Sequence, residues 1–276
     1  MTETDTSAST TIEIAAFTQA HLPGALALSQ AAGWPHRIED WALGLSVSQG
    51  VVAIENGCVV ATGLCSFHGP VATLNMIIVD ASLRGRGLGR QVMERIVALA
   101  GEREMRLVAT DEGLPLYRKL GFADVGRIVQ FQGPARATHP ERPVHIGPAD
   151  IGALAAMDSA ASGLRRQPLL ERIAEMGETL TTEGGFALLR PFGRGHVLGP
   201  VVARDATAAR ALIAAATGHL AGRFLRLDLR EDCGLAPFVE TLGLSRSGGG
   251  TAMHLAPRPR LQSDLQTYAL VSQALG

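Results

Sequence analysis

The stretch that decides the fold is residues 74–101, LNMIIVDASLRGRGLGRQVMERIVALAG. It begins with an apolar run at residues 76–79, which favours a buried strand. A turn rich in glycine and arginine follows at residues 84–90, and residues 92–99 then place apolar side chains at helical spacing. Backbone N–H groups in the first turn of a helix have no partner within it, and the helix dipole favours an anion there. The stretch therefore predicts a strand, a phosphate-binding turn and a long helix.

Three glycines alternate within the turn, at Gly85, Gly87 and Gly89. Because glycine has no Cβ atom, a pyrophosphate can approach this backbone closely. The spacing fits neither of two other phosphate motifs. A P-loop requires G-x-x-x-x-G-K-S/T, and no lysine or hydroxyl residue follows these glycines. A dinucleotide-binding turn requires G-x-G-x-x-G, which evenly spaced glycines do not provide.

A second motif, LYRKLGF, lies further along the chain at residues 116–122. With Val79 and Arg84 in view, the first stretch resembles motif A of the GNAT superfamily of N-acetyltransferases, whose signature is R/Q-x-x-G-x-G/A. The second stretch resembles motif B of that superfamily, Y-x-x-x-G-F. The glycine signature alone recurs by chance, but both motifs in this order on these elements are specific. The resemblance implies an N-acetyltransferase with acetyl-CoA as its cosubstrate.

The resemblance also implies which residues bind that cosubstrate. Backbone amides of residues 85–90 would hold the pyrophosphate, the arginines would add charge, and the amide of Val79 would pair with the pantetheine arm. At Thr110, where many members have asparagine, a hydroxyl would replace part of the hydrogen bonding. The implied cofactor-binding residues are Val79, Arg84, Gly85, Arg86, Gly87, Leu88, Gly89, Arg90 and Thr110.

Two residues take catalytic roles by the same resemblance. The amide of Ile77 would stabilise the oxyanion formed when an amine attacks the thioester. Tyr117 would protonate the departing thiolate, since a phenol of pKa about 10 can donate to a thiolate whose acid has a pKa of about 8.5. The alternative is that Tyr117 only packs on the sheet or on the CoA sulfur. Neither motif contains cysteine, which favours direct attack in a ternary complex over a covalent acetyl-enzyme.

No residue is singled out as the general base. Candidates close to the motifs or the acceptor side each have a common structural role as well; they are Asp80, Asp111, Glu112, Asn75, His36 and His68.

The remaining patterns predict an α/β fold with a mixed sheet, organised as two GNAT-like acyl-CoA N-acyltransferase folds in tandem. In the first half, strands are expected at residues 11–17, 51–55, 58–68, 76–79, 106–110 and 125–131. Helices are expected at 19–32, 38–45 and 114–120, and after the glycine turn with its apolar face at 92–99. In the second half, strands are expected at 185–190, 196–202, 224–229 and 247–255, and helices at 149–161, 167–178, 206–221 and 234–242. Asn56 and Gly57 predict a hairpin turn. We expect a disordered tail at 1–10, a catalytic domain at 11–133, a linker at 134–143 and a second domain at 144–276.

The second half lacks the marks of a CoA site. Residues 203–207 occupy the place of the phosphate turn but contain no glycine. Asp205 is predicted to cap the following helix, where its charge would oppose a phosphate. Val239 stands where motif B has its tyrosine. This half resembles the degenerate C-terminal domain of two-domain GNAT proteins, with a docked apolar C-terminal tail and no bound CoA.

Composition limits the partners. The net charge of −1 gives no basic field for nucleic acid, and no apolar run reaches the ~18 residues of a membrane helix. Three scattered cysteines fit neither a disulfide framework nor a zinc site, so a cytoplasmic protein without metal is expected. We expect a small-molecule amine as acceptor, and a homodimer is left open. Two alternatives remain, an acyl-CoA-binding sensor without turnover and a protein N-acetyltransferase.

Overall fold

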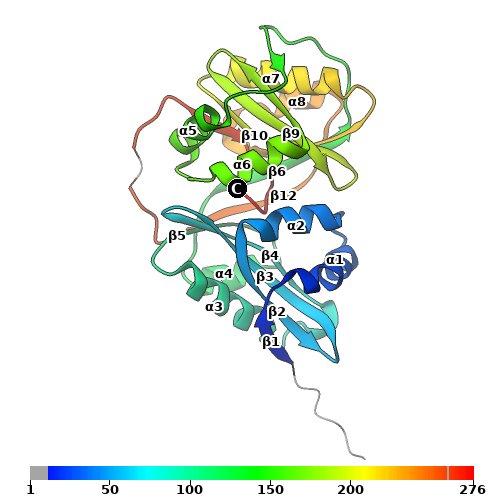
Figure 1. The fold of residues 1–276 in the computed structure, drawn as a ribbon, viewed down its shortest axis with the longest axis vertical. Helices are drawn as coiled ribbons and strands as arrows, with labels where there is room; N and C mark the ends of the chain where they lie inside the picture. The colour runs from blue at the N-terminus through cyan, green and yellow to red at the C-terminus, as the bar shows by residue number, and fades with distance from the viewer. Residues whose placement is uncertain (1–11, 260) are drawn as a thin grey trace, which may run out of the picture.

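The computed structural model describes residues 12–259 and 261–276, so the tail expected at residues 1–10 lies outside the described part. Within that part, thirteen strands form one mixed sheet in the order β1-β2-β3-β4-β5-β12-β6-β11-β13-β10-β9-β8-β7. Helices cover both faces of the sheet (Figure 1). The expected α/β class with a mixed sheet is confirmed.

The first half of the chain contributes the elements shown in blue to green in Figure 1. They are β1 (Glu13–Ala16), α1 (Leu22–Ala31), α2 (Ile38–Ser46), β2 (Ser48–Glu55), β3 (Cys58–His68), β4 (Val71–Val79), α3 (Leu88–Ala100), β5 (Glu104–Ala109), α4 (Leu114–Lys119) and β6 (Ala123–Pro134). Strands β2 and β3 pair antiparallel around Asn56 and Gly57, whose φ values are 52° and 78°. Positive φ at both positions is typical of a type I′ turn, so the expected hairpin is confirmed.

Two cores flank the sheet of this half. Successive residues of β2 alternate between them, because side chains of a strand point to opposite faces. Val51 packs in the cluster that contains Val92 and Ile96 of α3. Val52 packs in the cluster that contains Trp41 of α2. Helix α3 therefore covers one face, and α1 and α2 cover the other (Figure 1).

Strands β4 and β5 are parallel neighbours that separate after a short paired region. Pairing runs from Val71 opposite Glu104 to Thr73 opposite Arg106 and does not continue along the strands. The second half of β4, residues 74–79, thus has no hydrogen-bonded neighbour in β5. This opening lies next to the start of α3.

The second half contributes β7 (His145–Ile146), α5 (Ile151–Ser162), α6 (Gln167–Met176), β8 (Glu178–Thr182), β9 (Gly185–Phe192), β10 (Gly195–Ala203), α7 (Ala206–His219), β11 (Phe224–Arg230), α8 (Ala236–Thr241), β12 (Ser245–Leu255) and β13 (Gln266–Ala269). Short 3-10 turns lie at Gln19–His21, Ala81–Leu83 and Glu231–Cys233. The helices and strands from α5 to β12 follow in the same order as those from α1 to β6.

The closing strands of the two halves are exchanged. Strand β12 pairs antiparallel with β5, and β6 pairs antiparallel with β11. The two exchanged strands also pair with each other along most of their length. One continuous sheet therefore joins the halves, and each half completes the sheet of the other.

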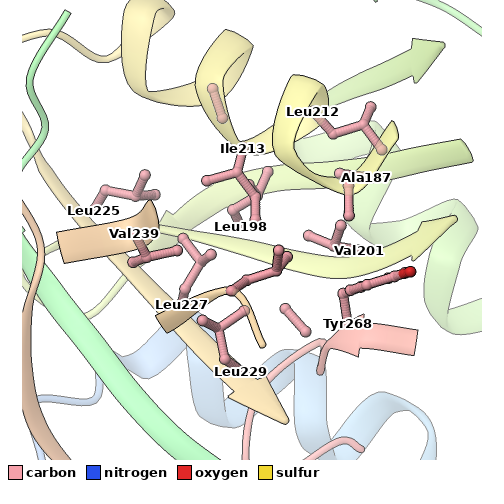
Figure 2. Close-up of a cluster of buried hydrophobic side chains, with 14 of the residues drawn as sticks. Ala187, Leu198, Val201, Leu212, Ile213, Leu225, Leu227, Leu229, Val239 and Tyr268 are labelled. Atoms are coloured by element: carbon pink, nitrogen blue, oxygen red, sulfur yellow. The ribbon is translucent and has the colours of Figure 1, made fainter. Parts of the chain in front are cut away.

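The gap between the parallel strands β10 and β11 is filled by β13. These strands pair only at His196–Leu225 and Val197–Arg226, after which Ala269 of β13 lies opposite both Val201 and Leu229. Figure 2 shows Tyr268 of β13 among the apolar side chains below α7. The corresponding gap between β4 and β5 has no such strand among the described residues.

Strands β7, β8 and β13 are absent from the sequence-based expectation. The helix expected at residues 167–178 ends at Met176, because Gly177 is extended and its α-carbon lies against β9. A Cβ atom there would lie 2.1 Å from the carbonyl oxygen of Leu189. Across residues 12–259 and 261–276, no helix has both the length and the hydropathy needed to cross a membrane.

Candidate active site

The glycine turn leads into α3 with its amides uncapped. Gly87 is the N-cap residue, with φ of 79°, and it provides no side chain to accept hydrogen bonds. The first amide that donates back to the backbone is that of Gln91, to the carbonyl of Gly87 at 3.1 Å. The amides of residues 88–90 thus have no acceptor within the helix. Leu88 is buried and anchors the turn, whereas Gly85 and Gly87 are exposed.

The arginines of this turn pair with carboxylates. Arg84 contacts Glu112 at 3.2 Å, Arg86 contacts Glu55 at 3.8 Å and Arg90 contacts Glu94 at 2.8 Å. All three arginine side chains are at least half exposed, so each pair contributes little to stability. The turn is therefore basic and accessible, with side chains that can rearrange toward an anion.

Helix α7 occupies the equivalent place in the second half and differs at its start. Asp205 accepts a hydrogen bond from the amide of Ala208 at 2.7 Å, which confirms its expected role as an N-cap. Its carboxylate occupies the position that a phosphate would take. The start of α7 is thus capped by its own side chain, and β13 fills the neighbouring gap in the sheet.

The glycine turn lies against the open part of β4 and against α4. A Cβ atom at Gly89 would lie 3.5 Å from Cγ2 of Val79 and 3.8 Å from Cδ2 of Leu116. Beyond Val79, a cavity of about 330 Å³ extends from this opening toward the second half. Ile77, Thr110 and Tyr117 line it from the first half, and Phe192, Arg194 and Arg226 line it from the second. Both halves of the chain therefore form its walls.

A bulge in β4 sets the direction of the Ile77 amide. Ile78 lies opposite Thr62 and Asn75 lies opposite Leu64, so Met76 and Ile77 together face one residue of β3. Met76 has φ of 51°, a left-handed conformation that costs about 1–2 kcal/mol in a residue with a Cβ atom. The carbonyl of Met76 accepts a hydrogen bond of 2.7 Å from the Thr62 hydroxyl. The N–H of Ile77 belongs to the same trans peptide and points the opposite way, away from β3.

Tyr117 is buried at 7% exposure beside the same opening. Burial raises the pKa of Tyr117 to about 12, so the phenol keeps its proton at any ordinary pH. Its ring packs edge-on against Phe122 and fills the space above Gly113, where a Cβ atom would lie 2.6 Å from the ring. Thr110 is fixed nearby, since its hydroxyl accepts a hydrogen bond from the Gly113 amide at 3.4 Å.

Comparison with known protein families assigns both halves of the chain to one kind of domain. Two family models, each described as an acetyltransferase (GNAT) domain, match residues 46–124 and residues 154–269. The chain carries two GNAT domains in tandem. An uncharacterised N-acetyltransferase of Bacillus subtilis (strain 168), YitH, is 28% identical over 274 residues, covering 93% of this chain and 95% of that protein. The relationship supports an acetyltransferase.

Solved structures share the fold of the whole chain. A putative acetyltransferase from Pyrococcus horikoshii superposes with a TM-score of 0.84 at 21% identity, covering 96% of both chains. A tandem GNAT protein from the clavulanic acid biosynthesis pathway superposes with a TM-score of 0.62 at 14% identity, covering 90% of this chain and all of that one. The tandem GNAT arrangement is therefore shared at the level of fold.

Two polar atoms on the wall of the cavity beyond Val79 lack hydrogen-bond partners among the described residues. Asn75 donates from Nδ2 to the Ser66 hydroxyl at 2.9 Å and to the Thr73 carbonyl at 3.2 Å, which leaves its Oδ1 without a donor. The second is Nδ1 of His36. Burial lowers the pKa of His36 to about 4, more than the nearby Asp40 raises it, so the imidazole is neutral near pH 7.

Three of the other base candidates have structural partners, and Asp111 is exposed and does not line the cavity. Asp80 accepts from the amide and hydroxyl of Ser82, and Glu112 pairs with Arg84. His68 is buried elsewhere, with its Nε2 at 3.3 Å from the Thr73 hydroxyl. None of the residues that line the cavity is aspartate or glutamate.

Sequence reasoning missed the residues from the second GNAT domain. Arg226 reaches the cavity because β6 carries the sheet across to β11, where Gln132 of β6 lies opposite Arg226. Phe192 of β9 lies beside it, with its ring 5.1 Å from the Arg226 guanidinium. Thr62 was also missed, since a threonine within a strand has many ordinary roles. No local motif marks these side chains, and only the positions of their strands bring them together.

Proposed function

We propose that the first GNAT domain, residues 11–133, transfers an acetyl group from acetyl-CoA to a primary amine of a small molecule. One observation carries this proposal: the uncapped glycine turn and the open edge of β4 lead into a cavity that contains both Ile77 and Tyr117. Residues 144–276 form a degenerate domain that holds no CoA. Asp205 at the start of α7 and β13 between β10 and β11 support that part of the proposal.

Donor binding follows from the backbone. The amides of residues 85–90 would donate to the pyrophosphate, with Arg84, Arg86 and Arg90 adding charge after leaving their carboxylate partners. The pantetheine arm would lie along the unpaired part of β4, where the amide of Val79 is available. The acetyl group would then reach the bulge at Met76.

The reaction proceeds by direct attack. The amine nitrogen bonds to the thioester carbonyl carbon, and the N–H of Ile77 stabilises the oxyanion that forms on the carbonyl oxygen. The C–S bond then breaks and the CoA sulfur takes the proton of the Tyr117 hydroxyl. The nitrogen loses its extra proton to water, and Tyr117 regains a proton from solvent. Atoms and charges balance as acetyl-CoA plus amine gives amide plus CoA thiol.

The cavity favours a small acceptor. Its volume of about 330 Å³ lies at the lower end of ligand pockets, which span about 300–1,000 Å³. Its walls come from both domains, and the aromatic rings of Trp34 and Phe192 close one side. These features support a small molecule over a protein side chain presented on a large surface.

The test is release of free CoA thiol over a panel of primary amines, with wild type compared with Tyr117→Phe. We expect the variant to lose about 10²-fold or more in kcat, as is typical when a general acid is removed. Its affinity for acetyl-CoA by calorimetry should stay within a few fold. Because the pKa of Tyr117 is raised to about 12, wild-type activity should rise with pH as the amine deprotonates and show no loss of the acid up to pH 10.

Tight binding of acetyl-CoA without thiol release on any amine would contradict the proposal and favour a sensor. If wild type turns over and Tyr117→Phe has an unchanged kcat, the proposed acetyl transfer stands, but Tyr117 is not its general acid. Lys119→Gln is the matched control on the same helix, since this side chain has no role in the cavity.

A further inference from the structure

We propose that the acceptor amine also carries a carboxylate, as an amino acid does, and that Arg226 binds this carboxylate while Asn75 receives the amine. The inference rests on the proposed acetyl transfer and names the class of its acceptor. It is carried by the charge of the cavity wall, by the free edge of Arg226 and by the unpartnered oxygen of Asn75.

The side chains that line the cavity include cations but no carboxylate. Two arginines line it, Arg226 within the cavity and Arg194 at an exposed position, and no carboxylate does. His36 adds no charge near pH 7, because burial lowers its pKa to about 4. The carboxylate that pairs with Arg226, that of Asp228, is fully buried and does not line the cavity, so a purely cationic amine would find no counter-ion in the lining. A carboxylate on the acceptor supplies that counter-ion.

Arg226 is oriented so that it can bind a carboxylate. Its Nε and Nη2 donate to the carboxylate of Asp228 at 2.9–3.2 Å, and its guanidinium lies 5.1 Å from the centre of the Phe192 ring. No hydrogen bond from Nη1 to any described residue is present, and the side chain is 12% exposed. One edge of the guanidinium is thus fixed by the protein, and the other is free for a ligand. Two parallel N–H donors match the two oxygens of a carboxylate.

Asp228 does not itself present a carboxylate to the cavity. It is fully buried, and its oxygens also accept hydrogen bonds from the backbone amide and the Nε2 of Gln273 at 3.1 Å. Its lone pairs are occupied by five donor contacts. Its role is to orient Arg226.

Asn75 is the residue that would receive the amine of the acceptor. Its Nδ2 faces the carbonyl of Thr73, which can only accept, so the amide orientation is fixed and Oδ1 is the unpartnered atom. Asn75 is 5% exposed and lines the cavity two residues before Ile77. An amine N–H donating to this oxygen would lie beside the peptide that faces the thioester. The unsatisfied oxygen would then gain its missing donor.

The experiment compares matched pairs of amines that differ only in the carboxylate: phenylalanine and phenethylamine, leucine and isoamylamine, lysine and cadaverine. Thiol release is measured across pH, and kcat/KM is expressed per neutral amine because a carboxylate lowers the pKa of the neighbouring ammonium. We expect at least one carboxylate-bearing member to exceed its partner by about 10- to 100-fold, the range for charge-assisted hydrogen bonds. Equal values in every pair overturn the inference while leaving the acetyl transfer intact.

Variants then locate the carboxylate. Arg226→Gln should lower kcat/KM for the carboxylate-bearing member far more than for the decarboxylated one, and so remove the preference within the pair. Since this variant leaves Asp228 buried without its cation, Arg226→Gln/Asp228→Asn serves as a second variant without that unpaired charge. Arg172→Gln, an exposed position on α6, is the control and should keep the preference. A preference that survives in both Arg226 variants overturns the assignment.

A different experiment tests the carboxylate site if the protein does not transfer acetyl groups. If no amine releases thiol, the same pairs are titrated by calorimetry into protein loaded with CoA. Tighter binding of the carboxylate-bearing member by tenfold or more, lost in Arg226→Gln, supports the inference without the reaction. Equal binding of both members overturns it.

Discussion

Among single residues, the proposed catalytic centre depends on one peptide group, whose direction is set from β3. The Thr62 hydroxyl holds the carbonyl of Met76 at 2.7 Å, and this fixes where the N–H of Ile77 points. Thr62 is fully buried and does not line the cavity, so under the proposal it acts through the peptide and is a positioning residue. Its effect should therefore appear in kcat more than in binding.

We predict that Thr62→Val lowers kcat by about tenfold, because a lost hydrogen bond of about 1 kcal/mol or more lets the strained bulge relax. The KM for acetyl-CoA should change by less than threefold. Steady-state thiol release measures both values. Thr62→Ser, which keeps the hydroxyl, should restore most of the rate, and equal loss in both variants would indicate a packing effect instead.

At the scale of elements, the two GNAT domains differ in how one helix begins. Helix α3 starts at a glycine in the left-handed region, whereas α7 starts at a carboxylate that caps its own amides. Nothing lies within 4 Å of a Cβ atom built on Gly87, so the backbone conformation is what requires glycine there. The free amides of α3 make it the phosphate-binding helix of the proposal.

We predict that Gly87→Asp abolishes acetyl-CoA binding, because it places a negative charge at the amides that would hold the pyrophosphate. Calorimetry measures the affinity, and circular dichroism checks that the fold remains. Gly87→Asn has the same shape without the charge and tolerates this φ, so it should weaken binding far less. Gly222→Asp is a matched control, with φ of 78° and no neighbouring atom within 4 Å. Unchanged affinity in Gly87→Asp would show that the CoA site lies elsewhere.

At the scale of the whole molecule, the halves are joined by the exchanged strands and by one buried ion pair. Asp40 of α2 and Arg190 of β9 are 3.3 Å apart, and both side chains are almost fully buried. Asp40 also accepts from Arg37 and from the amide of Gly193. Burial alone would raise the pKa of Asp40, but these hydrogen bonds and the charge of Arg190 hold it below 3.8.

We predict that Asp40→Ala lowers the free energy of unfolding by about 3–5 kcal/mol, the usual cost of leaving one partner of a buried pair alone. Because the pKa of Asp40 is lowered on folding, its contribution is present above about pH 4 and is lost as pH falls further. Chemical denaturation of wild type and variant at pH 7 and pH 3 measures this. The difference between the two proteins should shrink at pH 3.

Asp232→Ala breaks the exposed pair with Arg230 and should cost less than about 1 kcal/mol at either pH. A similar loss in both variants would show that burial of the Asp40 pair is not the cause.

Local patterns of residues were enough to predict the local parts of this protein. The strand, the glycine turn and α3, the hairpin at Asn56 and the cap at Asp205 each follow from a few consecutive residues whose conformational and hydrogen-bonding preferences act locally. The GNAT resemblance followed from the same residues. These features contain the candidate donor site.

Only the tertiary structure decided how the candidate acceptor site is built. The exchange of β6 and β12 and the insertion of β13 depend on pairing between strands far apart in the chain, and a short strand pairs by register and packing rather than by any motif of its own. That exchange brings Arg226 of the second domain to the cavity that contains Tyr117 of the first. Local chemistry therefore indicates the donor, and long-range packing shapes the site for the acceptor.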